Sequence, residues 1–432
     1  MYFKFINHAS IIIGNENFKF LTDPWYCETV FNDGWRLIYE DESQNLNNIE
    51  YDYIWYSHEH PDHFSVKDLK KISKEKKNKF KILFQKTKDK KVSNYLKKNN
   101  FIIEEMENLK TYELKKNIFF TINNIGGFDS WSMLEIDGKN ILNLNDCNLS
   151  DNDLIKIKNK WNKVDILLTQ FSFASWICNP GDNLLAKKQV ERVYKRVSKQ
   201  IDILKPKEII PFASFMYFCH EENKYLNEYT VKIKDFYNYF KDRCKVTVLF
   251  PEEVYESNKP HDNNNSLLKW QECYQKRLNQ HYLYNKPSIP FQDLNQEHSN
   301  YVSKIKKKNN FILIKLLSFF GFFKNQKIFL KDLDIMIKFN LTESLKIYDN
   351  TNNPDLTMSS ESFYYLLKYN WGRGTLFISG RVKCKYSKLQ SFMNITKIFY
   401  SNNIDLYLTS FRQLRYFFKK NNFSKLIEEF CE

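Results

Sequence analysis

The sequence predicts an α/β layered domain over residues 1–256, followed by a smaller α+β domain. Strand-like and helix-like segments alternate along the first part, and a polar stretch separates it from a second group of such segments. The length of 432 residues allows two or three domains with a well-buried core. The hydrophobic fraction of 42% excludes a wholly disordered chain. No run reaches the roughly 18 apolar residues of a membrane-spanning helix.

Apolar periodicity and turn residues define the elements of the first domain. Short apolar runs at 11–13 and 18–21, separated by Gly-Asn-Glu-Asn, predict a hairpin. A strand at 51–56 leads into a histidine-rich segment. The clearest helix spans 184–204, because its Val, Ile and Leu residues share one face, and Pro206 ends it. Further strands are predicted at 80–84, 119–125, 132–136, 140–144, 165–170, 208–212 and 245–250, and further helices at 66–77 and 92–98.

The remainder of the chain divides by composition. Residues 257–303 are rich in Asn and Gln, which predicts a polar connector with one helix near 267–278. Residues 304–330 form a basic, apolar segment. Residues 331–432 predict a small α+β unit, in which the Trp-Gly-Arg-Gly sequence at 371–374 indicates a hairpin.

The basic, apolar stretch from Lys304 to Lys327 has two interpretations. The simpler one is a helix that packs on the core with solvated lysine flanks. The alternative is peripheral membrane contact, because a basic run followed by Leu and Phe suits the interface of a bilayer. Its apolar part is too short to span one.

Charge and cysteine content limit the partners. The 66 basic and 51 acidic residues give a net charge of +15, and only nine of the basic residues are Arg. Because lysine is the weaker residue for bidentate recognition and no basic–aromatic module is evident, we expect no nucleic-acid partner. The eight cysteines are irregularly spaced and the N-terminus lacks the pattern of a signal peptide, so we expect reduced thiols in a cytoplasmic protein.

The strongest signal for chemistry is the run His-x-His-x-Asp-His at 58–63, directly after a predicted strand. Neutral imidazoles and carboxylates are ligands for zinc and iron. His58 and His60 can point to one side of an extended backbone, and Asp62 and His63 follow at a turn. Because three of the eight histidines fall within six residues, the run predicts a site for two adjacent metal ions.

This run resembles the signature of the metallo-β-lactamase superfamily. His8-Ala9-Ser10 and the Leu-Thr-Asp-Pro-Trp sequence at 21–25 are similar to the entry hairpin of its members. The resemblance implies a four-layer αββα sandwich with metals on the loops at one edge. It also implies Asp129 at the place of a usual histidine, Asp146 as a bridging carboxylate and His220 as the final histidine.

With Asp129 in place of the usual histidine, the sequence resembles one branch of the superfamily, the CMP-N-acetylneuraminate hydroxylase family. The resemblance covers roughly residues 1–250. The resemblance implies hydroxylation of an activated sugar or a similar anionic small molecule. The ligands of a Rieske cluster are absent from these 432 residues, so electrons would come from a separate electron-donor protein. The shared segments are Ser57-His58, Asp62-His63, Asp129, Asp146-Cys147, 171–175 and 211–220.

The resemblance therefore implies a complete site. Two divalent metal ions are expected, and iron is favoured over zinc because an aspartate in place of a neutral histidine suits a harder ion. Two alternatives stay open: a zinc-type hydrolase that cleaves an ester, amide or phosphodiester bond with Asp62 as base, and a non-catalytic membrane-surface binding module. The predicted metal ligands are His58, His60, Asp62, His63, Asp129, Asp146 and His220, and the predicted catalytic residues are Asp62, His220 and Glu221.

Several weaker candidates have an ordinary structural explanation as well. His8 could reach the site, although a hydrogen-bonded structural role is simpler, and Glu222 could orient a ligand. The remaining candidates are Ser172, Ser175 and Trp176 as pocket residues, and Arg373 and Arg381 as phosphate-binding residues.

Overall fold

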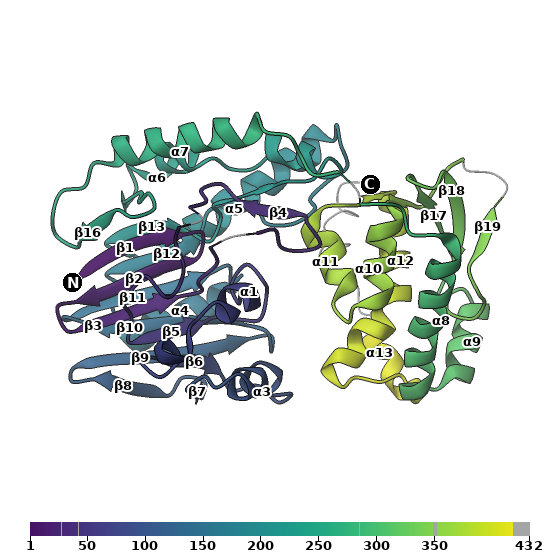
Figure 1. The fold of residues 1–432 in the computed structure, drawn as a ribbon, viewed down its shortest axis with the longest axis horizontal. Helices are drawn as coiled ribbons and strands as arrows, with labels where there is room; N and C mark the ends of the chain where they lie inside the picture. The colour runs from purple at the N-terminus through teal and green to yellow at the C-terminus, as the bar shows by residue number, and fades with distance from the viewer. Residues whose placement is uncertain (27, 42, 285, 349–351, 418–432) are drawn as a thin grey trace.

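The computed structural model describes residues 1–417, except 27, 42, 285 and 349–351, and consists of two lobes (Figure 1). The N-terminal lobe contains two seven-stranded sheets, and the C-terminal lobe contains one five-stranded sheet. The first sheet has the order β16-β1-β2-β3-β5-β6-β7, with β1 Tyr2–Asn7, β2 Ser10–Asn15, β3 Phe18–Thr22, β5 Tyr53–Tyr56, β6 Lys81–Gln85, β7 Ile103–Met106 and β16 Val254–Glu256.

The second sheet is antiparallel at one end and parallel at the other. In the first sheet, β2 and β3 form the hairpin that the sequence predicts. In the second sheet, the turn around Gly138 joins β10 to β11, which pair from Ile136 back to Ser132. The order is β15-β13-β12-β11-β10-β9-β8, with β8 Thr111–Lys115, β9 Ile118–Ile125, β10 Asp129–Ile136, β11 Lys139–Asn145, β12 Ile166–Gln170, β13 Glu208–Phe212 and β15 Lys245–Val246.

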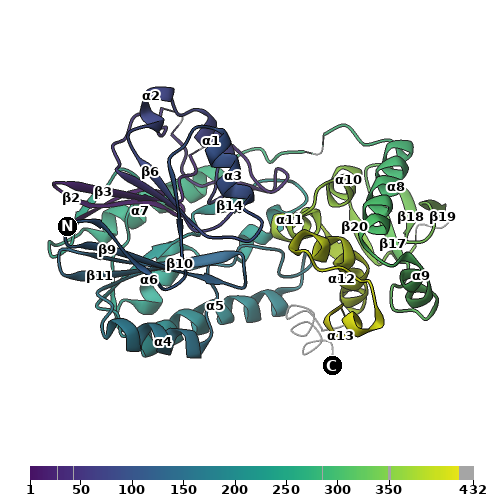
Figure 2. The same cartoon turned by 90° about the horizontal axis from the view of Figure 1, so that it is seen from below.

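The two sheets pack face to face, with helices outside both. One core joins residues such as Phe5 and Phe20 of the first sheet to Phe120 and Leu142 of the second. Helices α1 and α3 cover the outer face of the first sheet, and α4 and α5 cover that of the second (Figure 2). The helices are α1 Val66–Lys70, α2 Lys74–Lys77, α3 Lys91–Lys98, α4 Asp151–Trp161, α5 Asn183–Leu204, α6 Ile233–Phe240 and α7 Asn263–Leu278. The predicted αββα sandwich is confirmed.

Strand direction brings several loops to one edge of this sandwich. Strands β3, β5 and β6 run parallel in the first sheet, as do β11, β12 and β13 in the second. Strand β10 is antiparallel to β11, so its first residue, Asp129, lies at the same edge as the end of β11. Hydrogen bonds from Ser130 and Asn145 to Ser57 join the two sheets there. The loops that carry the histidine-rich run therefore meet loops of the second sheet.

The C-terminal lobe is an α+β unit, and some of its helices face the N-terminal lobe. Its sheet has the order β19-β18-β17-β20-β21. In both views, α10, α11 and α12 lie toward the sandwich, whereas α9 lies at the far end (Figures 1 and 2). The elements are α8 Phe291–Lys308, α9 Phe311–Phe319, β17 Gln326–Leu330, β18 Ile335–Phe339, β19 Lys346–Tyr348, β20 Leu356–Met358, α10 Ser360–Lys368, α11 Gly372–Ser379, β21 Lys383–Cys384, α12 Tyr386–Ser401 and α13 Leu414–Phe417.

Two sequence predictions for this part of the chain are wrong in detail. The polar stretch after residue 257 holds helix α7 and the start of α8, rather than one helix. The Gly-marked hairpin at 371–374 is the start of α11. Gly372 is required there because a Cβ atom would lie 2.5 Å from the carbonyl oxygen of Tyr365 in α10. The glycine therefore allows two helices to approach closely and does not mark a turn.

The two lobes share a continuous core. Trp35 and Trp176 of the N-terminal lobe belong to the same buried cluster as Leu376 and Phe392 of the C-terminal lobe. The Trp35 indole donates a hydrogen bond to the carbonyl of Ile378, at 3.0 Å. This packing holds α11 against the sandwich.

A buried ion network lies at the same contact. The Arg381 guanidinium, whose side chain is wholly buried, donates to Glu222 at 2.6 Å and to Glu361 at 2.8 Å. The Arg373 guanidinium stacks 3.9 Å from the centroid of the Tyr400 ring. Both arginines expected as phosphate-binding candidates are thus engaged within the protein.

Candidate metal centre

Five loops at the edge of the sandwich position the candidate ligands. His8 lies in the turn between β1 and β2, and Asp23 directly follows β3. The histidine-rich run follows β5, Asp129 begins β10, and Asp146 follows β11. Because parallel strands end on the same side, residues far apart in sequence converge here. All of the predicted metal ligands except His220 lie on these loops.

Three overlapping groups of donor atoms have the spacing of metal sites. Within each group, all ligand atoms lie within 4.8 Å of one another. The Nε2 atom of His58 lies 3.6 Å from Oδ2 of Asp146, and Nε2 of His63 lies 3.7 Å from the same oxygen. Asp146 therefore lies between these two imidazoles, where its carboxylate would help to hold a bound ion. The groups are His8, Asp62 and His63; His58, His63 and Asp146; and His58, His60 and Asp129.

Hydrogen bonds outside the groups orient the imidazoles. The wholly buried Asp23 carboxylate accepts from the backbone N–H and hydroxyl of Ser57, both at 2.7 Å, and lies 3.0 Å from Nδ1 of His63. The Ser57 hydroxyl lies 2.9 Å from Nδ1 of His58. In both histidines the contact occupies Nδ1, and Nε2 faces the other candidate ligands. A carboxylate behind a ligating histidine is the usual arrangement around a bound metal.

The chemistry of the donor set fits metal ions. Among the described residues, Asp62 Oδ1, Asp146 Oδ1 and His8 Nδ1 are buried without a hydrogen-bond partner. Buried polar atoms are rarely left without a partner, so the two carboxylate oxygens are suited to contact with a cation or ordered water. Nε2 of His58 and Nδ1 of His60 approach to 2.9 Å, as two nitrogens do when both face one ion.

Proton affinities also reflect the crowding of charge. Burial raises the pKa of the Asp129 carboxyl to about 7, and the neighbouring Asp146 carboxylate adds to the effect. Burial lowers the pKa of His58 well below its usual value, with further lowering from His63. Although burial alone would lower it, the pKa of His63 is raised well above the usual value by Asp62 and Asp146. Metal ions would relieve the repulsion among these carboxylates.

Strained backbone surrounds the cluster. Four non-glycine residues at this edge have positive φ angles: His8 at 37°, Asp23 at 32°, Asn145 at 53° and Ala213 at 47°. Such angles are costly for L-residues and concentrate at functional sites. Asn145 donates a hydrogen bond to the Asp23 carboxylate, at 2.5 Å, so its strained position helps to hold Asp23.

The structure places His220 and Glu221 elsewhere. After β13 the chain leaves the edge at Ala213 and forms β14, Met216–Phe218, which pairs with β4, Trp35–Leu37. This ribbon carries His220 toward the C-terminal lobe, where burial and Arg381 lower its pKa to about 4. His220 is in none of the three donor groups found among the described residues. Glu221 pairs with Lys224 at 2.6 Å.

Of the weaker candidates, His8 lies at the cluster, whereas Glu222, Ser172 and Trp176 have structural contacts elsewhere. His8 joins the cluster, with Nε2 3.5 Å from Oδ2 of Asp62. Glu222 instead belongs to the interlobe ion network with Arg381. The Ser172 hydroxyl accepts a hydrogen bond from the backbone of Val231. Trp176 is buried in the shared core, and its backbone N–H donates to the carbonyl of Phe377.

A cavity of about 590 Å³ opens onto the cluster. His58, His60 and Asp129 form its floor, together with Phe31 and Phe128 of the N-terminal lobe. The C-terminal lobe supplies the opposite wall, which is largely aromatic. That wall consists of Tyr365, Trp371, Gly374, Thr375, Ile378 and Tyr400. The second lobe therefore completes the pocket.

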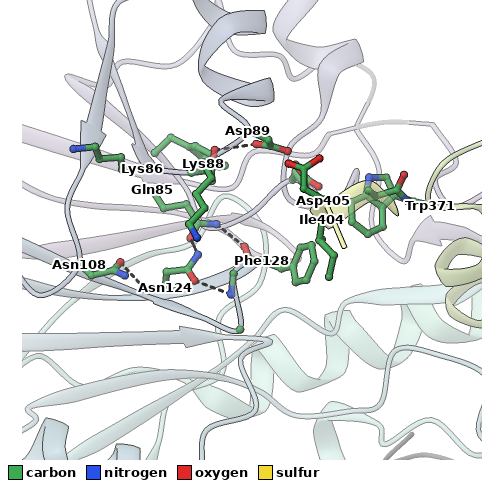
Figure 3. Close-up of a pocket in the computed structure, with 16 residues that line it drawn as sticks. Gln85, Lys86, Lys88, Asp89, Asn108, Asn124, Phe128, Trp371, Ile404 and Asp405 are labelled. Atoms are coloured by element: carbon green, nitrogen blue, oxygen red, sulfur yellow. Dashed lines mark hydrogen bonds between the residues drawn. The ribbon is translucent and has the colours of Figure 1, made fainter. Parts of the chain in front are cut away.

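A second cavity of about 570 Å³ adjoins the first (Figure 3). Glu59, Phe128 and Trp371 line both cavities, and the rings of Phe128 and Trp371 meet at right angles with centroids 5.4 Å apart. This pair lies between an apolar chamber at the cluster and a second chamber with more polar side chains in its lining. The polar side chains of the second chamber include Gln85, Lys86, Lys88, Asp89, Asn108, Asn124 and Asp405.

Sequence reasoning did not assign the residues that orient the ligands. Asp23 and Ser57 belong to segments that resemble the family, but the sequence assigned them no role. Asn145 has no feature in the sequence that indicates a function. Their positions immediately after buried strands are the signal that could have identified them, because loops at the carboxyl edge gather in space. The contribution of Tyr365 or Trp371 had no comparable signal.

Comparisons with known proteins concern the N-terminal lobe. Residues 2–169 match the family model described as the beta-lactamase superfamily domain. Two curated relatives are the cytidine monophosphate-N-acetylneuraminic acid hydroxylases of Danio rerio, 24% identical over 251 residues, and Xenopus laevis, 25% identical over 248 residues. Each alignment covers 53% of this chain and 40% of the relative, so the chain spans less than half of their length.

Among solved structures, CmlA, a diiron β-hydroxylase from Streptomyces venezuelae, has a TM-score of 0.44 at 12% identity over 59% of this chain and 54% of its own. Igni18, a metallo hydrolase from Ignicoccus hospitalis, has a TM-score of 0.38 at 16% identity over 60% of this chain and 99% of its own. The αββα layers give the N-terminal lobe the metallo-β-lactamase fold, and its sequence is similar to the beta-lactamase superfamily domain and to the cytidine monophosphate-N-acetylneuraminic acid hydroxylases.

Proposed function

We propose that the protein is an iron-dependent hydroxylase that acts on an activated sugar or a similar anionic small molecule. The observation that carries the proposal is the composition of the donor set. Four imidazoles and three carboxylates converge, with Asp146 between His58 and His63 and Asp129 beside His60. A mixed set of imidazoles and carboxylates with open positions suits iron that activates oxygen.

The curated relatives support the same choice. Their alignments with this chain cover 53% of it, and both relatives are named as hydroxylases. Because they share only about a quarter of the aligned residues, the activity and the substrate are our proposals for this chain. Electrons would come from a separate electron-donor protein.

Bound iron would supply the activation of dioxygen, and the residues of the chain would supply position and enclosure. His58, His60 and Asp129 would hold one ion at the cavity, and His8, Asp62 and His63 would hold the other. Asp146 would contribute beside His58 and His63. Asp23 and Ser57 fix the rings of His63 and His58. The aromatic wall of the cavity would exclude bulk water from the reacting group.

The two chambers indicate how a substrate would lie. The chamber at the cluster is mostly apolar and would hold the part of the substrate to be oxidised. The second chamber mixes lysines, carboxylates and amides, a lining that favours the hydroxyl and amide groups of a sugar over a bare phosphate. Lys86 and Lys88 would lie near an anionic substituent.

A zinc-type hydrolase is the second candidate. The observation that favours it is the complete His-x-His-x-Asp-His run, in which the buried Asp62 keeps one oxygen free of hydrogen bonds. Zinc would supply Lewis-acid chemistry on an ester, amide or phosphodiester, and Asp62 would hold a proton of the attacking water.

Metal analysis separates the candidates. We expect protein purified without added metal to contain two irons per chain and to consume oxygen when a reductant and a CMP-activated sugar are supplied. His58→Ala should lose iron, whereas His281→Ala, which changes an exposed histidine, should not. Zinc with oxygen-independent hydrolysis would instead support the second candidate, and absence of stoichiometric metal would refute both.

A further inference from the structure

Helix α9 has two apolar faces, and only one of them is buried. Leu313, Ile314 and Leu317 pack into the core of the C-terminal lobe. The opposite side should be polar in an ordinary surface helix, because an amphipathic helix buries one stripe and solvates the other. Here the exposed side is apolar, with Ile312 (74% exposed), Leu316, Phe319 (85%), Phe320 (70%) and Phe322. We call these five side chains the α9 patch.

The α9 patch is unusual for this protein. Within the described part of the chain, nineteen large hydrophobic side chains are exposed. Five of them fall in the eleven residues from Ile312 to Phe322, and the rest are spread along the sequence. Single exposed hydrophobic residues are normal, but a contiguous group marks a surface that binds something. The spacing of Ile312, Leu316 and Phe319 places them on one face of the helix.

The segment of the sequence that carries the α9 patch is rich in lysine and contains no acidic residue. Between Glu297 and Asp332 the sequence contains no Asp or Glu. The ammonium groups of Lys306 and Lys315 lie 4.6 and 5.5 Å from the centroid of the Phe311 ring, on the rim of the helix. Exposed lysines of this region are Lys304, Lys306, Lys307, Lys308, Lys315 and Lys324.

We propose that the α9 patch docks the protein onto a membrane surface that contains anionic lipids. The phenylalanine side chains would enter the interface between headgroups and acyl chains, and the lysines would contact the headgroups. A second copy of this chain is a poor occupant, because a two-fold contact would bring two lysine-rich rims together. In the described ranges, no helix is long and apolar enough to cross a bilayer, so α9 would lie in the membrane plane.

The position of the helix suits such a contact. Helix α9 lies at the end of the C-terminal lobe that faces away from the sandwich (Figures 1 and 2). Docking through this end would leave the metal-binding edge in the aqueous phase. The proposal therefore does not depend on which reaction the site carries out.

Vesicle binding by the full chain tests the proposal. We expect sedimentation with vesicles of phosphatidylcholine and phosphatidylglycerol at low salt, and little with phosphatidylcholine alone. Phe319→Ser with Phe320→Ser should lower the partition coefficient by about 30-fold or more, because two aromatic anchors are lost. Lys307→Gln with Lys315→Gln should weaken binding to the anionic vesicles only.

A matched control changes two equally exposed side chains elsewhere, Leu184→Ser with Tyr284→Ser, and should bind as the unchanged protein does. The melting temperature and metal content of each variant show that the fold is intact. Absence of binding to anionic vesicles at low salt would overturn the proposal. So would equal loss of binding in the control, or a dimer that depends on the α9 patch and forms without lipid affinity.

Discussion

The buried carboxylate of Asp23 lies 3.0 Å from Nδ1 of His63, and this contact turns the other ring nitrogen of His63 toward Asp62 and Asp146. Asp23 also accepts hydrogen bonds from Ser57, which adjoins His58 in the chain. Asp23 thus aligns two imidazoles of the candidate metal centre while lying outside the donor groups. It is a positioning residue.

The first prediction concerns this role. Asp23→Asn should lower metal affinity by about 10- to 100-fold, because partners behind a ligating histidine usually have effects of this size. Competition with a chelator measures the change. The control Asp202→Asn, which removes a surface ion pair with Arg243, should leave affinity unchanged. Unaltered affinity in the Asp23 variant would show that His63 is oriented by other contacts.

The second prediction is a pH dependence of metal binding. Since the pKa of Asp129 is about 7 in the folded, metal-free protein, its carboxyl is protonated below that pH and a metal must displace the proton. Metal affinity should therefore fall by about tenfold for each pH unit below about 7 through this group alone. Titrations on both sides of neutral pH measure it, and Asp129→Asn should flatten the profile.

The raised pKa of Asp129 also affects the free energy of unfolding of the metal-free protein. The pKa of Asp129 is raised above its value in the unfolded chain, so the stability that this group contributes is fully present at acid pH and is lost as the pH rises through about 7. Denaturation of the metal-free protein should show this decline, and Asp129→Asn should remove it. A profile identical to that of the variant would contradict the assignment.

The third prediction concerns the interlobe ion network. Arg381→Met removes the buried guanidinium from Glu222 and Glu361, whose remaining partners are the more exposed Lys331 and Lys286. It should reduce the free energy of unfolding by at most about 3–5 kcal/mol. Urea denaturation measures the loss. Lys199→Met, which breaks an exposed pair with Asp151 outside this network, should cost less than about 1 kcal/mol. Adding Glu222→Gln to Arg381→Met should restore part of the stability.

The fourth prediction concerns the partition between the chambers. Trp371→Ala removes the ring that meets Phe128, and should raise KM by about tenfold with little change in metal content, because it alters substrate contacts only. Tyr369→Ala, an exposed aromatic residue outside both linings, is the matched control. A fall in bound metal in the Trp371 variant would mean that the ring supports the cluster instead.

Much of the N-terminal lobe could be predicted from sequence, because its strands are short apolar runs bounded by turn residues. The run from His58 to His63 could be placed on a loop for the same reason. The position of His220 could not be foreseen, since it depends on β14 pairing with β4 far away in the chain. Pairing over such distances leaves no local pattern.

The C-terminal lobe was harder to interpret. Gly372 suggested a turn, but its lack of a side chain serves a close helix contact with Tyr365 that exists only in three dimensions. The aromatic wall that Trp371 and Tyr400 give to the metal cavity depends on how two lobes dock. The apolar composition of the segment around Phe319 was visible, but which of its faces is buried was not.

The continuous core between the lobes has a consequence for how the protein folds. Trp35, Trp176 and Phe218 are buried because Leu376 and its neighbours cover them. A chain cut after residue 256 would expose that aromatic surface to water and would be prone to aggregate. The N-terminal sandwich and its companion lobe should therefore melt in a single cooperative transition, and neither half is expected to fold as an independent module.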